Sequence, residues 1–258
     1  VDSPHSGRHY PADFGHALPF SVMRRAEDAW VDELFGDAAR FGASFLAAEF
    51  ARAYVDPNRH EHDMDADLVD GPLPAHARPT YRSEWGLGVV RRLLGAREPI
   101  YDRPLTVDEI HRRLDAYHRP YHETLGRMLD GAHRRAGCVY HLNVHSMLSK
   151  SRGRPRPDFV LSDRDGETSG PAFTGFVRAT LERMGYSVAI NDPFKGAEIV
   201  KRYGQPADGR HSLQIEIRRG LYMDERAVEK SDGFEALRST MGALVEEVAG
   251  FARKGLAR

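Results

Sequence analysis

Two histidines lie at the ends of predicted β-strands, where they could bind a metal ion. His5 ends the short segment 1–5, and His145 follows the mostly apolar segment 137–144. Both side chains would open onto the same edge of a parallel sheet. Zinc hydrolases use neutral imidazoles and a carboxylate as ligands and leave one position for water. The sequence therefore predicts a hydrolytic metal site that contains His5 and His145.

An acidic residue near position 28 is the expected third ligand. Glu27 and Asp28 both lie near the start of the predicted helix 26–40. We prefer Asp28 and keep Glu27 as the alternative. The chain has 13 histidines, and the competing interpretation of any one of them is a surface or hydrogen-bonded core residue.

Glu216 is the candidate general base. It lies among apolar residues in the predicted strand 212–217, where burial raises the pKa of a carboxyl and a nearby metal lowers it. Such a group could take a proton from the attacking water and pass it to the leaving amine. The alternative is a structural salt bridge with Arg202, Arg218 or Arg219.

Three cations in predicted loops could bind a substrate carboxylate. Arg59 and Arg202 follow strand-like segments, and a guanidinium suits bidentate capture of a carboxylate. Lys195 could add a point charge, and Asn58 next to Arg59 is included as a substrate contact. The alternative is that these cations are solvated surface residues.

The predicted elements alternate between strands and helices. Thr106 and Glu109 form a capping box at the start of the strongest helical pattern, and Pro120 should kink that helix. Strands are expected at 44–48, 52–56, 137–144, 187–190 and 212–217, and helices at 26–40, 106–135, 173–184 and 228–253. This order predicts a three-layer α/β/α fold with a mostly parallel mixed central sheet, in a single domain over 1–258.

Composition limits the classes of partner. The chain of 258 residues carries 37 basic and 38 acidic side chains, so it lacks the electrostatic signature of a nucleic-acid or lipid binder. No apolar run is long enough to span a bilayer. The single cysteine, Cys138, favours a reducing compartment, and we expect a cytoplasmic protein acting on a small molecule. The sequence does not indicate an oligomeric state.

The order of motifs resembles the N-formylglutamate amidohydrolase family, which contains zinc-dependent deformylases of histidine breakdown related to zinc carboxypeptidases and aspartoacylases. The resemblance covers most of the chain and depends on the shared order of the segments. The matching segments are 3–7, 27–34, 54–59, 119–122, 144–146, 157–159, 194–196, 202–206, 214–216 and 222–223.

This resemblance implies one zinc ion held by His5, Asp28 and His145, with Glu216 as the base. It also implies an amide of an acidic amino acid as substrate, N-formyl-L-glutamate first, with Arg59 and Arg202 as carboxylate anchors.

The sequence departs from the family pattern at three places. Asn143 stands where an aspartate is usual, and Met147-Leu148 replaces an Ile-Arg pair, so a cation expected near the site is missing. Segment 160–163 also differs from the usual Asn-Leu-Gly-Thr. The missing cation leaves another N-acylated amino acid or small amide open as the substrate.

Two other functions compete with an amidohydrolase. One is a catalytically silent relative that binds a metal or ligand without turnover. The other is a carboxypeptidase-like peptidase, which would need a wider cleft than the long segment after Arg59 suggests.

Overall fold

A six-stranded mixed sheet forms the centre of the computed structural model, which describes residues 1–95 and 98–256. The strand order is β2-β1-β5-β10-β8-β9, and only the β10–β8 pair is antiparallel among these neighbours. The strands are β1 (Asp2–Ser3), β2 (Leu46–Ala47), β5 (Val139–Met147), β8 (Phe159–Ser162), β9 (Val188–Ile190) and β10 (Arg210–Arg218). The predicted α/β class with a mostly parallel mixed sheet is confirmed.

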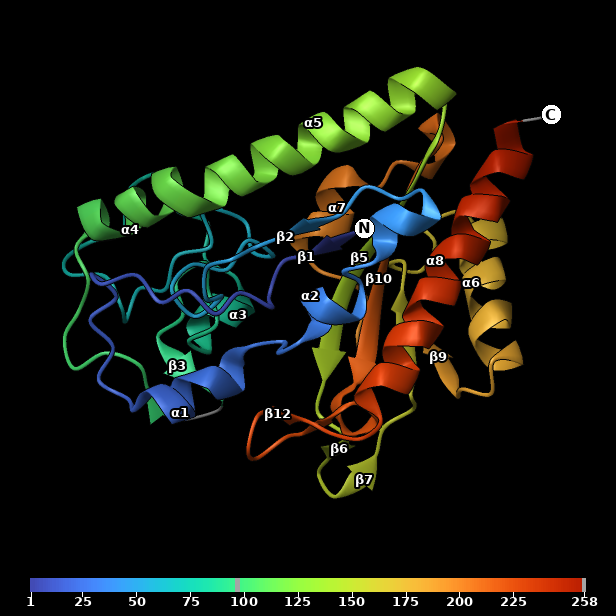
Figure 1. Cartoon of the computed structure of the whole chain (residues 1–258). Helices are drawn as coiled ribbons and strands as arrows, with labels where there is room; N and C mark the ends of the chain where they lie inside the picture. The colour runs from blue at the N-terminus through green and yellow to red at the C-terminus, as the bar shows by residue number, and fades with distance from the viewer. Residues whose placement is uncertain (96–97, 257–258) are drawn as a thin grey trace. The chain divides into compact units, whose positions relative to one another are not determined.

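Helices cover the sheet. Helices α6 (Pro171–Arg183) and α8 (Phe234–Leu256) lie along one side of it (Figure 1), and the short α2 (Val31–Leu34) joins them in the same apolar core. The residues from Leu125 onward in α5 (Arg119–Ala136), and α7 (Glu198–Tyr203), belong to the same compact unit as the sheet. Leu142, Val144 and Ile215 of the sheet are all at most 1% exposed in that core.

The two long central strands, β5 and β10, pair in parallel over nine residues, with His145 opposite Glu216. Because side chains alternate along a strand, register partners lie on the same face. One face of the pair carries Leu142, Val144 and Ile215, while the opposite face carries mainly polar side chains. His145 lies within β5 rather than after its end, which corrects the predicted strand limit of 144.

Three predicted elements differ from the structure. The helix expected over 228–253 begins only at Phe234, and Glu229–Lys230 form a short strand. The helix expected over 26–40 is a 3-10 turn η1 (Arg24–Ala26), α2, and a second 3-10 turn η2 (Ala38–Phe41). Trp30 interrupts the pattern because its φ of 67° is left-handed, a conformation that no helix interior accepts. The strand expected at 52–56 is a series of turns. The capping box at Thr106 and Glu109 is present. Near the kink expected at Pro120, the helix contains a π-helical segment, η3 (Leu114–His118).

The chain forms two compact units. The first contains Val1–Ser3, Asp28–Ala47 and the residues from Leu125 onward, and the second contains Pro4–Glu27 and Ala48–Thr124. The single domain expected over 1–258 stays a prediction. The second unit has its own buried residues, which include Tyr54, Met64 and Ile100.

The second unit is built from short elements. They are α1 (Phe20–Met23), η1, α3 (Tyr81–Glu84), β3 (Leu93–Leu94), β4 (Glu98–Pro99), α4 (Val107–Arg113) and η3. The remaining short elements of the first unit are β6 (Lys150–Ser151), β7 (Arg154–Pro155), η4 (Pro206–Asp208), η5 (Arg219–Leu221), β11 (Met223–Asp224) and β12 (Glu229–Lys230). In the described ranges, no helix combines the length and the apolar character needed to cross a membrane.

Candidate metal centre and active site

The structure brings His5, Asp28 and His145 together. Each offers one ligand atom, and these atoms all lie within 4.8 Å of one another. All three residues are buried. Among the described residues, no other group of three His, Cys, Asp or Glu side chains has this spacing. The alternative ligand, Glu27, is outside the group and accepts a hydrogen bond of 2.8 Å from the hydroxyl of Tyr10.

Asn143 orients the ring of His145. The Asn143 amide nitrogen Nδ2 lies 2.8 Å from Oδ1 of Asp2, which can only accept. Its amide oxygen therefore faces His145 and accepts from Nε2 at 2.8 Å. These bonds place the proton of a neutral His145 ring on Nε2 and leave Nδ1 as the nitrogen that can bind a metal.

A buried polar chain continues from Asn143 along the same face. Oδ1 of Asp2 also accepts from Nε2 of His141 at 2.8 Å. The other ring nitrogen, Nδ1 of His141, then accepts from the hydroxyl of Ser212 at 2.8 Å. Each of these side chains is at most 2% exposed. Burial in this network fixes the position of Asn143, since any movement would leave polar atoms without partners.

His5 is oriented in the same way by a carboxylate. Its Nε2 donates to Oδ1 of Asp56 at 2.7 Å, so Nδ1 is the nitrogen suited to a metal. Oδ2 of Asp56 accepts from Arg52 at 3.0 Å and from Arg91 at 3.2 Å. Burial alone would raise the pKa of Asp56, but the charges of His5, Arg52 and Arg59 hold it well below its usual range.

The segment after His5 is fixed by a close approach of two backbones. A side chain at Gly7 would place its Cβ 2.2 Å from the carbonyl oxygen of Phe50. Two residues later, the amide of His9 donates to the carbonyl of Glu49 at 2.8 Å. Glycine is required at position 7 because no larger residue fits.

Arg219 is a site residue that the sequence did not single out. Its Nη2 lies 3.2 Å from Oδ1 of Asp28, and its Nε donates to the hydroxyl of Ser146 at 3.0 Å. Arg219 is 7% exposed. The sequence analysis named it only as one of three possible salt-bridge partners of Glu216, and the structure shows an ion pair with Asp28.

The three candidate ligands fit a divalent metal ion. Nδ1 of His145 lies 3.0 Å from Oδ2 of Asp28. With the ring proton on Nε2, these two atoms are both acceptors, and a metal ion between them would make the contact favourable. Zinc bonds to these atom types are about 2 Å long, so two ligands of one ion lie at most about 4 Å apart. A spacing within 4.8 Å therefore needs only a small inward movement.

Glu216 lies next to His145 on the neighbouring strand. The side-chain oxygen of Gln214 accepts from the amide of Ala197 at 3.1 Å, so its Nε2 faces Glu216 and donates to Oε1 at 2.9 Å. Glu216 is 9% exposed. A carboxylate at this position is the form of the side chain that can take a proton from water.

Arg59 and Asn58 are buried in the second unit. The Arg59 guanidinium donates to the carbonyl of Asn58 at 2.7 Å and to that of Leu87 at 3.0 Å. Burial lowers the pKa of Arg59 to about 10, so the side chain stays protonated at neutral pH. Its hydrogen-bonding partners here are carbonyl oxygens, which carry no full charge.

Arg202 and Lys195 are exposed in the first unit. Nζ of Lys195 lies 2.7 Å from Oδ2 of Asp165, and the Arg202 guanidinium lies 5.7 Å from the centroid of the Tyr203 ring. Their exposure agrees with the surface alternative, and their role as substrate contacts stays a prediction.

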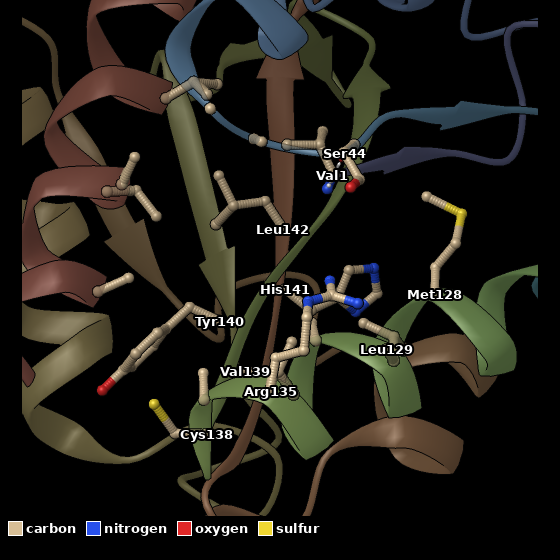
Figure 2. Close-up of a pocket in the computed structure, with 18 of the residues that line it drawn as sticks. Val1, Ser44, Met128, Leu129, Arg135, Cys138, Val139, Tyr140, His141 and Leu142 are labelled. Carbon is tan, nitrogen blue, oxygen red and sulfur yellow. Dashed lines mark hydrogen bonds between the residues drawn. The ribbon is translucent and has the colours of Figure 1, made fainter. Parts of the chain in front are cut away.

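An apolar cavity of about 310 Å³ lies elsewhere in the first unit. Figure 2 shows Tyr140 and Leu142 of β5 together with Met128 and Leu129 of α5 around it. None of the predicted metal, catalytic or substrate-binding residues is among the described residues that line it. The candidate active site is therefore the ligand group and not this cavity.

Comparisons with known proteins identify the family of this chain. A family model described as N-formylglutamate amidohydrolase matches residues 1–223. N-formylglutamate deformylases from Pseudomonas aeruginosa and Pseudomonas putida are 28% and 29% identical, over 98% and 87% of this chain and 93% and 81% of theirs. The crystal structure of N-formylglutamate amidohydrolase from Ralstonia eutropha JMP134 is 44% identical, with a TM-score of 0.94, and the match covers 98% of this chain and 93% of that one. The chain belongs to the N-formylglutamate amidohydrolase family.

Proposed function

We propose that this protein is a zinc-dependent amidohydrolase that removes the formyl group from N-formyl-L-glutamate and releases formate and L-glutamate. The observation that carries the proposal is the buried group of His5, Asp28 and His145, with Glu216 beside His145 on the next strand. The names of the two Pseudomonas relatives and of the Ralstonia structure support the same substrate.

The proposed roles follow from the positions of the side chains. Zinc held by the three ligands would polarise the formyl carbonyl and lower the pKa of water. Glu216 takes a proton from the attacking water and gives it to the leaving nitrogen. Asn143 and Asp56 hold the two imidazoles in the orientation that presents Nδ1.

The substrate contacts are proposals of the same kind. Arg59 is the stronger candidate for a carboxylate anchor, because its charge is buried and its hydrogen bonds go to backbone carbonyls. Asn58 would assist from the same segment. Arg202 and Lys195 would reach the substrate from the solvent-exposed surface.

The proposal also includes the cellular setting. We infer from the family resemblance that the reaction belongs to histidine breakdown, and the single cysteine favours a reducing cytoplasm. A fractionation of the source cells that finds the protein outside the cytoplasm would contradict the second point.

Formate release from N-formyl-L-glutamate tests the reaction directly. The purified protein is assayed after metal removal and again after zinc is added back, with other N-formyl amino acids and N-acetyl-L-glutamate as comparators. We expect zinc-restored activity that is highest on N-formyl-L-glutamate. Zinc-dependent activity that is highest on another compound would keep the mechanism and reject this substrate.

Glu216→Gln separates an enzyme from a silent metal-binding relative. The variant should lose activity by a factor of at least about 100, the lower range for general acid–base catalysis, and should retain one zinc per chain. Glu229→Gln is the matched control, because Glu229 is exposed in β12 and should keep full activity. Equal activity of both variants would remove Glu216 from the mechanism.

A further inference from the structure

Arg156 is a half-buried cation with no carboxylate beside it. Its guanidinium carbon lies 4.8 Å from the centroid of the Phe194 ring, and Nη1 lies 3.9 Å from Sδ of Met147. The Nε atom is buried and has no hydrogen-bond partner. Within residues 1–95 and 98–256, no Asp or Glu is paired with this side chain. By contrast, the nearby Arg218 forms an ion pair with Asp158.

The two groups that hold Arg156 lie on the polar face of the central strands. Met147 is two residues beyond His145 in β5, so it projects from the same face, roughly 7 Å further along the strand. Segment 194–197 is held on this face too, because its last amide donates to the glutamine that also bonds Glu216. The β6–β7 hairpin, which directly precedes Arg156, lies at the carboxyl end of β5 (Figure 1).

The state of the guanidinium indicates what it would bind. Withdrawing a charge from water without a partner costs free energy, and an anion that reaches the group recovers it. Stacking on Phe194 fixes the plane of the guanidinium, while its two terminal nitrogens match the spacing of the two oxygens of a carboxylate.

We propose that Arg156 forms a carboxylate-binding subsite on the same strand face as His145 and Glu216. The ligand is a carboxylate of an N-acyl amino acid, so the inference rests on the proposed function. Arg156 supplies the cation of this subsite from the segment that follows β5 and the β6–β7 hairpin.

Kinetics on matched substrates test this subsite. Arg156→Leu is assayed on N-formyl-L-glutamate, on N-formyl-L-glutamine and on the α-amide of N-formyl-L-glutamate. A hydrogen-bonded charge pair is worth roughly 1.5–3 kcal/mol, so kcat/KM for N-formyl-L-glutamate should fall about 10- to 150-fold, mainly through KM. The amide that lacks the bound carboxylate should change less than twofold, which identifies the carboxylate, and Arg156→Lys should recover part of the loss.

Arg154→Leu is the matched control, because Arg154 is exposed in β7 only two residues away and should behave as the wild type. If Arg156→Leu changes all three substrates by one common factor, or changes none, the subsite is wrong.

The proposed function fails if the wild-type protein releases no formate from any compound. A second measurement tests the subsite separately from that failure. In that case the Kd of glutarate, measured by calorimetry, decides the question. A Kd that rises at least tenfold in Arg156→Leu supports the subsite, and an unchanged Kd or no glutarate binding overturns it.

Discussion

Replacing Asn143 with alanine tests whether the buried polar chain orients the metal ligand. The substitution removes the acceptor of the 2.8 Å bond from His145 and the donor of the 2.8 Å bond to Asp2. Loss of an oriented partner behind a metal-binding histidine typically weakens metal binding 10- to 100-fold, which is about 1.4–2.7 kcal/mol. Asn143 is 0% exposed, so water does not readily replace the lost bonds. We expect the metal-free protein to lose about 2–4 kcal/mol of unfolding free energy as well.

Zinc affinity and stability are measured separately for this variant. Competition with a chromophoric chelator gives the zinc Kd, and urea unfolding of the metal-free protein gives the free energy. Asn191→Ala is the control, because Asn191 also makes two side-chain hydrogen bonds, both to Asp163, and lies outside the ligand group. It should lose stability without a change in zinc Kd. A zinc Kd for Asn143→Ala within twofold of the wild type would refute the orientation argument.

Three further predictions concern the surroundings of the site and one helix cap. Arg219→Met removes the cation that lies 3.2 Å from the buried Asp28, and should cost the metal-free protein about 3–5 kcal/mol in urea unfolding, with a smaller loss when zinc is bound. Gly7→Ala forces a Cβ to within 2.2 Å of a carbonyl oxygen and should cost at least about 2 kcal/mol in the same assay. The hydrogen bond from Arg103 lowers the pKa of Glu109 to about 2. Because the pKa is lower in the folded state, ionised Glu109 stabilises the protein above pH 4.5, its ordinary pKa. This stabilisation is lost as the pH falls toward 2. Because Arg103 is exposed, Glu109→Gln should cost only about 1 kcal/mol at pH 7, with a gap to the wild type that narrows by pH 3.

The fold class could be predicted because the signals that define it are local. The cap at Thr106 and the apolar stretches of the central strands depend on neighbouring residues alone, and both appear in the structure. The helix expected over 26–40 failed for a physical reason. Its apolar spacing is suitable, but the left-handed backbone at Trp30 is set by contacts with distant residues, such as the bond from its indole to the carbonyl of Val228 at 3.3 Å.

The grouping of the three candidate ligands could also be predicted, because residues at the carboxyl ends of neighbouring parallel strands lie at the same edge of a sheet. Asp2 of β1 is the register partner of Asn143 in β5, so the residues that follow each strand are brought together by the pairing itself. The groups that orient the ligands are different. Arg219 reaches Asp28 across 191 residues of sequence, and no spacing rule relates two positions that far apart.

The polar face of β5 explains why its function was only partly visible in the sequence. His141, Asn143 and His145 alternate with Leu142 and Val144, which is the pattern of a strand with one apolar face, although such strands usually place the polar face in water. Here the polar face is buried too, so every side chain on it needs a partner. Lysine and glutamate, which suit a face in water, would carry full charges and cost most to bury. Histidine and asparagine cost less free energy to bury, but each still needs a hydrogen-bond partner or a metal ion. That remaining cost is offset where these groups position a metal ligand. The choice of polar residue within the alternation, more than the alternation itself, is the signal that points to this strand as part of the proposed metal site.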